Sequence, residues 1–154
     1  MSIILDTNAY LDVVRELLAS GHTNVPVTIS GTSMTPFLDP GDTVCLNRPV
    51  GGVKPGDVVL FTRPGGRYIL HRVVRVLPDG ALEILGDAQM ASEILPDDSH
   101  VWGVVTEALH GNQRLTAESL RWRFFAGPWS KAKRSRYYVN RIRNGIRRHT
   151  GWTL

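Results

Sequence analysis

The chain has 154 residues, of which 42% are hydrophobic and 21% are charged. This composition is typical of one globular domain and excludes a disordered or low-complexity protein. A single cysteine, Cys45, excludes an internal disulfide. The net charge of +4 hides an asymmetry, because residues 1–111 carry 7 Lys and Arg against 13 Asp and Glu, whereas residues 112–154 carry 11 against one. The sequence therefore predicts a mildly acidic body followed by a strongly basic extension.

Residues 6–20 are predicted to form an amphipathic helix. Asp6 or Thr7 can cap its N-terminus, and Gly21 follows as a stop signal. Apolar residues recur at helical spacing, namely Tyr10, Leu11, Val14, Leu17 and Leu18. We expect this stripe to pack on the rest of the protein. The first residues lack the pattern of a secretory signal peptide, and no run of apolar residues is long enough for a transmembrane anchor.

Residues 25–109 are predicted to form a mostly-β body. Short runs rich in Val, Ile and Leu alternate with turns that contain Pro and Gly. The runs are 25–30, 42–47, 57–62, 67–76, 81–85 and 101–109. Hairpin-length connections imply antiparallel neighbours, so we expect a compact antiparallel folded-over sheet or partial barrel.

The basic extension is predicted to be helical. Residues 116–125 suggest one helix, which Gly127-Pro128 should break, and residues 130–148 suggest a second. In the second helix four apolar residues fall on one face and arginines cover the remainder. The four are Tyr138, Val139, Ile142 and Ile146.

Ser33 stands at the junction of a predicted strand and a turn. Residues 25–29 are strand formers, whereas Pro36 lacks a backbone donor and cannot continue the strand. With Gly31 two positions before it, the Ser33 hydroxyl can be exposed and flanked by free backbone N–H groups. A serine nucleophile and its oxyanion site require these parts. A plain Gly-Ser-Pro turn is the alternative interpretation.

His71 is the candidate base for such a nucleophile. Strand alternation puts it on the same face as Ile69 and Val73, which suggests a half-buried imidazole. Burial disfavours the charged form, so the ring would be neutral and able to accept a proton near pH 7. A structural histidine is the alternative interpretation.

Asp87 is the candidate carboxylate partner of His71. A carboxylate can hold a histidine base in the correct tautomer and stabilise its imidazolium form. Asp87 ends the strand that is expected to pair with the His71 strand across the turn at 78–80. Asp97 and Asp98 are further candidates for the same role, and an ordinary Gly-Asp turn is the alternative.

These residues belong to an ordered set of motifs that resembles the signal peptidase I family and its relatives, the self-cleaving repressors of the bacterial damage response. The motifs are Gly31-Thr-Ser33-Met34-Thr-Pro36, Pro40-Gly41-Asp42, Pro55-Gly56-Asp57-Val58-Val59, Leu70-His71-Arg72-Val73-Val74 and Gly86-Asp87-Ala88-Gln89. The set spans residues 25–109 in the family's order. The resemblance implies a serine endopeptidase, with a catalytic domain at 1–111 and a basic helical extension at 112–154.

The resemblance also implies roles for individual residues. Ser33 is the nucleophile, and Met34 packs beneath it. Histidine stands where most bacterial members have a lysine base, which is similar to the archaeal and endoplasmic-reticulum branch. In that branch a Ser-His pair works with an aspartate, which matches Ser33, His71 and Asp87.

The candidate oxyanion site departs from that of signal peptidases. Gly31 replaces a serine whose hydroxyl usually helps to hold the oxyanion. We therefore expect backbone N–H groups of the stretch containing Gly31, Thr32 and Met34 to bind the substrate, with the N–H of Ser33 as the chief donor. The family's membrane anchor and its large accessory β-domain also have no counterpart in the sequence, so we expect a cytoplasmic protein or one peripheral to a membrane.

The expected partner is a peptide or preprotein with small side chains, such as alanine, next to the cut, as the resemblance implies. The five histidines show no metal-ligand spacing, so no metal or cofactor is expected. Residues 112–154 are expected to contact an anionic partner, which can be a membrane surface or, alternatively, the acidic body itself with the apolar stripe packed on it. Nucleic acid is not expected as a partner, because the single N-terminal helix is too little for a helix-turn-helix.

Two other interpretations stay open at this point. The chain can be a catalytically inactive or regulatory binding module, whose basic tail contacts nucleic acid or an anionic membrane. Alternatively Cys45 can be a thiol nucleophile, although its place in a strand beside Val44 and Leu46 is typical of a small buried residue. Lys54 is the only lysine candidate for a base, and it precedes Pro55 in a predicted turn.

Overall fold

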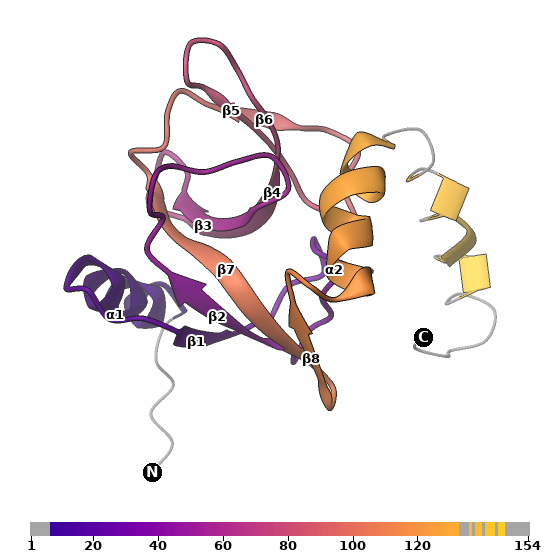
Figure 1. Ribbon diagram of the computed structural model, residues 1–154, viewed down its shortest axis with the longest axis horizontal. Helices are drawn as coiled ribbons and strands as arrows, with labels where there is room; N and C mark the ends of the chain where they lie inside the picture. The colour runs from indigo at the N-terminus through magenta and orange to yellow at the C-terminus, as the bar shows by residue number, and fades with distance from the viewer. Residues whose placement is uncertain (1–6, 133–135, 137, 140, 144, 147–154) are drawn as a thin grey trace.

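The computed structural model describes residues 7–132, 136, 138–139, 141–143 and 145–146. Over this part of the chain, eight antiparallel strands form one sheet that is not closed into a barrel (Figure 1). The strand order is β1-β2-β7-β3-β4-β5-β6, and β8 pairs with β7. The strands are β1 (Val25–Thr28), β2 (Thr43–Asn47), β3 (Val58–Thr62), β4 (Tyr68–Val76), β5 (Leu82–Leu85), β6 (Glu93–Leu95), β7 (Val101–His110) and β8 (Gln113–Thr116). The helices are α1 (Thr7–Ala19), α2 (Leu120–Phe124) and the π-helix η1 (Phe125–Trp129).

The predicted mostly-β antiparallel fold is confirmed. Each of the six predicted runs contains a strand, and the helix predicted at 6–20 is present from Thr7 to Ala19. Two strands were not predicted, because β6 has only three residues and β8 is polar except for Leu115. As a consequence, the helix predicted at 116–125 begins only at Leu120.

The predicted break at Gly127-Pro128 is wrong. Pro128 lies inside η1, and the helix continues into Ser130 and Lys131. A π-helical turn widens the backbone and so accommodates a proline that an α-helix would exclude. Of the second predicted helix at 130–148, only the described residues can be compared, and nearly all of them are helical.

Bulges fold the sheet over on itself. The register shifts between Cys45 and Leu46 in β2, at Leu60 in β3, and between Val73 and Arg75 in β4. An extra residue on one strand increases the local bend and twist. The fold-over creates two hydrophobic cores. The smaller core is enclosed by β3, β4, β5, β6 and the start of β7.

The larger core joins the N-terminal helix, the sheet and the C-terminal extension. Val14 and Leu18 of α1 enter it from one side. Trp122, Phe125 and Trp129 of the extension enter it as well, and each is less than 10% exposed. Residues beyond 111 are therefore part of the same core as the body, which fixes α2 and η1 beside the loops described below.

The predicted apolar stripe of the tail lies partly against the body. Val139, Ile142 and Ile146 line a cavity of about 470 Å³ together with Pro36 and Phe125. The three side chains keep between 39% and 63% of their surface exposed. Among the residues that the structure describes, no helix is long and apolar enough to cross a membrane.

Candidate active site

Ser33 lies in the turn that follows β1, where the predicted strand ends. The turn is closed by Thr35, whose N–H and hydroxyl both donate to the carbonyl of Thr32, at 3.1 and 2.9 Å. Ser33 itself is partly exposed, whereas Met34 below it is 2% exposed and belongs to the larger core. Because Met34 is buried in the core, it anchors the turn to the body. The neighbouring Ser33 side chain stays partly exposed at the edge of this core.

Backbone donors beside Ser33 are free. In the described part of the chain, the N–H groups of Gly31, Thr32, Ser33 and Met34 donate no hydrogen bond. Free N–H groups next to a hydroxyl can hold the negative oxygen that develops when the hydroxyl attacks a carbonyl. The turn therefore offers donors of the kind that an oxyanion site requires, and their role in binding an oxyanion stays a prediction.

A groove opens beside Ser33. It has a volume of about 540 Å³, and apolar side chains form most of its wall. Two stretches of backbone border it, Val27–Gly31 and Arg67–Leu70, and the first turns of α1 close it with Tyr10 and Leu11. A volume of this size lies within the range of clefts that bind ligands.

His71 lies on the face of β4 that was predicted from strand alternation. It is 2% exposed, and its ring stands 6.2 Å from that of Phe61, between centroids. Burial lowers the pKa of His71 below its usual value of 6.5, and this effect outweighs the opposite influence of Glu93. The imidazole is therefore neutral at pH 7 and can accept a proton.

Gly86 brings Ser33 and His71 together. A Cβ built on Gly86 would stand 2.7 Å from the Ser33 carbonyl oxygen and 3.0 Å from His71 Nε2. The same carbonyl accepts the N–H of Ala88 at 2.9 Å. The two predicted site residues thus meet at the Gly-Asp box, where only a residue without a side chain fits. Among the hydrogen bonds of the described residues, none joins the Ser33 hydroxyl to His71.

Glu93 is the carboxylate that faces His71. Its Oε1 lies 3.5 Å from His71 Nδ1, a buried nitrogen that has no hydrogen-bond partner among the described residues. Arg63 holds the same carboxylate with two bonds, of 2.6 Å from Nη2 and 2.8 Å from Nε. The hydrogen bond from Arg63 is the main reason that the pKa of Glu93 is lowered, so the carboxylate stays ionised. A negative charge near Nδ1 favours the tautomer with its proton on Nδ1 and with Nε2 free.

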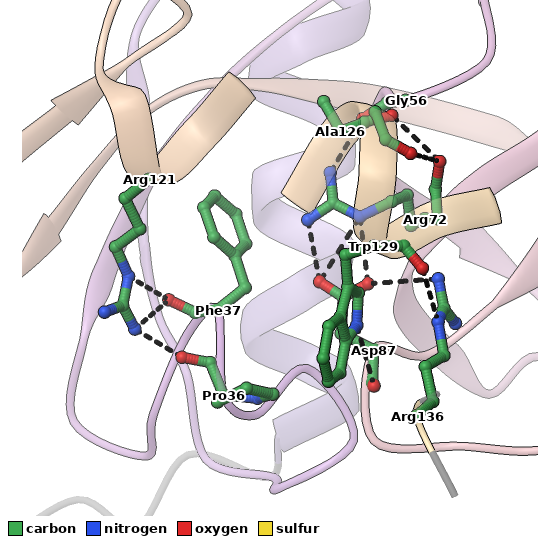
Figure 2. A network of polar contacts seen from close by, with 11 residues as sticks. Pro36, Phe37, Gly56, Arg72, Asp87, Arg121, Ala126, Trp129 and Arg136 are labelled. Carbon is green, nitrogen blue, oxygen red and sulfur yellow. Dashed lines mark hydrogen bonds and ion pairs between the residues drawn. The ribbon is translucent and has the colours of Figure 1, made fainter. Parts of the chain in front are cut away.

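The contact predicted between Asp87 and His71 is not formed. The Asp87 carboxylate is fully buried and paired with Arg72, at 2.9 Å from Nε and 2.7 Å from Nη2 (Figure 2). The physical reason is strand alternation, since Arg72 follows His71 and points to the opposite face of β4. Asp87 therefore lies on the Arg72 side, and Glu93 of β6 reaches the His71 side.

The Arg72–Asp87 pair is the centre of a buried network. Arg72 also donates to the carbonyl of Gly56 at 2.8 Å, and Trp129 Nε1 donates to the carbonyl of Asp87 at 3.3 Å (Figure 2). A second arginine, Arg136, lies near the same carboxylate, with its Nη2 4.0 Å from Asp87 Oδ1. Burial lowers the pKa of Arg136, and Asp87 opposes this effect. Asp87 thus compensates buried arginines, which is a structural task.

The other candidates are not assembled into a site. Asp97 is exposed and accepts the N–H of Ser99, and the neighbouring Asp98 is exposed as well. Burial is the main reason that the pKa of the Cys45 thiol is raised, which is the opposite of activation. Lys54 is exposed in its turn. Within the described residues, no cluster of His, Cys, Asp and Glu could hold a metal ion.

Sequence reasoning missed Glu93, Arg63 and Arg72. An acidic residue six positions after the Gly-Asp box was the only signal for Glu93, and it did not distinguish this residue from Asp97 and Asp98. Arg72 could have been found from its place beside His71, because a charged residue on the buried face of a central strand needs a partner.

Comparisons with known proteins place the chain in a family. A family model described as Peptidase S24-like matches residues 2–106. That region contains Ser33, His71, Gly86 and Glu93, together with the groove beside them. Comparisons with curated proteins and with solved structures found no match. Because the match covers more than half of the sequence and includes both residues that meet at Gly86, the chain belongs to the Peptidase S24-like family.

Proposed function

We propose that the protein is a serine endopeptidase in which Ser33 is the nucleophile, His71 is the general base and Glu93 positions His71. The observation that carries this proposal is the convergence of the Ser33 carbonyl and Nε2 of the buried His71 on Gly86, beside a groove. The family supports peptidase chemistry in general. The assignment of roles to these residues is our own inference.

The reaction follows from the geometry. His71 Nε2 accepts the proton of the Ser33 hydroxyl as Oγ attacks the carbonyl carbon of the scissile bond. The tetrahedral oxyanion accepts hydrogen bonds from the free N–H of Ser33 and its neighbours. The C–N bond then breaks, and the amine leaves with the proton of the imidazolium. Water, deprotonated by His71, hydrolyses the acyl-enzyme and regenerates the serine.

Glu93 replaces Asp87 as the third participant in this proposal. Its charge can stabilise the imidazolium that forms during attack, and it faces the nitrogen that keeps its proton. The distance of 3.5 Å to Nδ1 and the shared bonds with Arg63 make it a weaker partner than a fully buried carboxylate. The Ser33 hydroxyl must also turn toward His71, a closure that substrate binding commonly produces.

An extended peptide is the substrate that suits the groove. One border is β1, the outer strand of the sheet, and the other is the first part of β4. Before Arg72, β4 pairs only with β3 among the described strands. Both borders thus present backbone groups with which a peptide can pair as an added strand. Small or apolar side chains would suit the narrow, mainly apolar space next to Ser33.

The test is cleavage of a peptide library by the parent protein and by Ser33→Ala. We expect cleavage by the parent protein and none by the variant, because the nucleophile is lost. The stability of the variant should stay within about 0.5 kcal/mol, since the Ser33 side chain makes no hydrogen bond among the described residues. A serine-directed fluorophosphonate should label the parent protein at Ser33 only. Equal cleavage by both proteins would disprove the assignment.

A further inference from the structure

We propose that residues 120–132 together with Arg136, here called the C-terminal segment, position the loops of the active site, and that Arg121 is the positioning residue for the Ser33 turn. The segment lies beyond the region that the family model matches. The effect on turnover rests on the proposed function, because it requires an active peptidase. The statement that the segment holds the loops does not depend on activity.

Arg121 binds the turn that carries Ser33. Its Nη2 donates to the carbonyl of Pro36 and, at 3.1 Å, to that of Phe37, while its Nε lies 3.3 Å from the Phe37 carbonyl (Figure 2). A guanidinium is a planar fork of donors, so it can bridge two consecutive carbonyls and fix the angle between them. The peptide units fixed in this way lie only three and four positions after Ser33.

The aromatic side chains of the segment pack against Phe37, which belongs to the same turn. Phe37 is fully buried. Its ring stands edge-on to Trp122, with centroids 5.4 Å apart, and is tilted against Phe125 at 5.3 Å. The guanidinium of Arg72 covers the ring at 4.7 Å. Phe37 is thus enclosed mainly by α2 and η1.

A second loop, the Gly-Asp box, is held by the end of the segment. Trp129 Nε1 donates to the carbonyl of Asp87, and Arg136 Nε donates to the carbonyl of Trp129 at 2.9 Å (Figure 2). The next residue, Ala88, donates its N–H to the carbonyl of Ser33. The two loops that meet at the catalytic serine are therefore tied to each other and to one C-terminal segment.

A third loop contacts the segment through a glycine. Gly56 has a φ of +97°, and a Cβ there would stand 3.0 Å from the carbonyl oxygen of Ala126 in η1. The Gly56 carbonyl also accepts the bond from Arg72 that continues to Asp87. The Pro-Gly-Asp turn is therefore fitted to η1, and it links the segment to the buried Arg72–Asp87 pair.

These contacts predict a role in catalysis rather than in general stability alone. The N–H groups beside Ser33 bind no other group among the described residues, so their direction depends on how firmly the turn is held. A displacement of about 1 Å in catalytic geometry can reduce a rate roughly 100-fold. A loosened segment should therefore lower kcat more than it raises KM.

The experiment compares Arg121→Met with Arg123→Met in the full-length protein. Both are arginines of α2, but Arg123 is exposed, and among the described residues its side chain makes no hydrogen bond, ion pair or ring contact. Hydrogen exchange detected by mass spectrometry reports on residues 34–38, and kcat and KM on the peptide cleaved by the parent protein report on catalysis. Two milder variants are added in case Arg121→Met fails to fold. Arg121→Lys keeps a charged donor, and Trp129→Phe removes the N–H that reaches Asp87 while keeping an aromatic ring in the core.

We expect Arg121→Met to speed exchange in residues 34–38 and to lower kcat, each by about tenfold, because charge-assisted hydrogen bonds to two carbonyls are lost. Arg121→Lys should restore part of both losses, Trp129→Phe should speed exchange at residues 88–89, and Arg123→Met should change neither quantity. Unchanged exchange in Arg121→Met and Trp129→Phe would overturn the proposal, as would faster exchange with unchanged kcat. If the parent protein cleaves no peptide, the proposed function fails, and the exchange data still decide whether the segment holds the loops.

Discussion

At the scale of single residues, two carboxylates near the candidate base have separate tasks. Glu93 faces His71 and is held ionised by Arg63, whereas Asp87 is buried against Arg72. Both lie close to the same strand, β4, but on its opposite faces. Substitutions at the two positions should therefore give different kinds of defect, which allows the assignment to be checked residue by residue.

Glu93→Gln should shift the pH dependence of turnover. In the proposed mechanism activity requires neutral His71, so the rate should rise with pH through the pKa of His71, which burial lowers below 6.5. Glu93 raises that pKa, so removing its charge should move the acid limb of kcat/KM to lower pH. The maximal rate should fall by about 10- to 100-fold, which is less than the roughly 10⁴-fold cost of disrupting a buried triad carboxylate.

The control for this variant is Glu107→Gln. Glu107 is also held by two bonds from an arginine, Arg114, at 2.6 and 2.7 Å, but it lies on β7 and does not face His71. The control should keep the parent pH profile. If Glu93→Gln kept it as well, Glu93 would have no role in positioning the base.

Acid should also destabilise the fold through His71. Its pKa is lower in the folded protein than in the unfolded chain, so the unfolded chain binds more protons between the lowered value and 6.5. Stability contributed by neutral His71 is present above pH 6.5 and is lost as the pH falls through this window.

Asp87→Asn should reduce stability rather than shift the pH profile. The substitution leaves Arg72 buried with a neutral partner, and breaking a buried ion pair on one side costs about 3–5 kcal/mol. Denaturant unfolding measures the loss. The double variant Asp87→Leu with Arg72→Met removes both charges and should be more stable than the single variant. A stable Asp87→Asn protein with a displaced acid limb would instead identify Asp87 as the partner of His71.

At the scale of elements, α1 forms one wall of the groove and is fixed by three polar contacts. Tyr10 donates to the carbonyl of Pro26 at 3.1 Å, and Tyr68 of β4 donates to the carboxylate of Asp12. Arg15 stands over the ring of Trp102 at 5.0 Å. These contacts join the helix to both borders of the groove, so the width of the groove depends on them.

Tyr68→Phe should loosen α1 from β4. Burial raises the pKa of Tyr68 to about 12, so the hydroxyl keeps its proton and donates it to Asp12 at every accessible pH. Loss of a hydrogen bond to a charged group should cost about 1.5–3 kcal/mol of stability. For peptides cleaved by the parent protein, KM should rise while kcat changes little. A variant with unchanged KM would show that α1 does not shape the groove.

At the scale of the whole molecule, the basic extension has two sides. Toward the body, Arg121 binds carbonyls, Arg136 is buried, and Arg143 pairs with Asp39 at 3.2 Å. Toward water, Arg123, Lys131 and Arg141 are exposed, as are the apolar side chains of Leu120, Phe124 and Tyr138. We propose that the outer side contacts an anionic membrane surface, to which each basic residue near the lipid contributes about 1 kcal/mol.

Vesicle co-sedimentation should show binding of the full-length protein to anionic lipid at low salt. Binding should weaken at high salt and be absent with neutral lipid. The triple variant Arg123→Gln, Lys131→Gln and Arg141→Gln should bind more weakly. A matched variant with Arg15→Gln, Arg48→Gln and Arg67→Gln loses the same charge from the body and should bind as the parent protein does. If the parent protein stays in the supernatant with anionic vesicles at low salt, the membrane proposal is wrong.

The sequence determined the local features of this protein. The period-2 pattern and the Pro-Gly turns predicted the antiparallel strands, because short connections leave few other ways to pair them. The order of the motifs predicted the family, and alternation along β4 placed His71 and Arg72 on opposite faces. Ser33 was recognised from its own neighbours, since the end of a strand and Pro36 define its turn.

Only the tertiary structure decided which groups meet. Glu93 reaches His71 because β6 pairs with β5, with Glu93 opposite Ile84. This pairing could not be predicted from the sequence, because a strand of three residues has no recognisable pattern. Asp87 turns to Arg72 because a buried guanidinium requires a buried carboxylate. The C-terminal segment reaches the Ser33 turn across about 85 residues of chain. Contacts of such range depend on how the sheet folds over, and local sequence patterns do not encode that geometry.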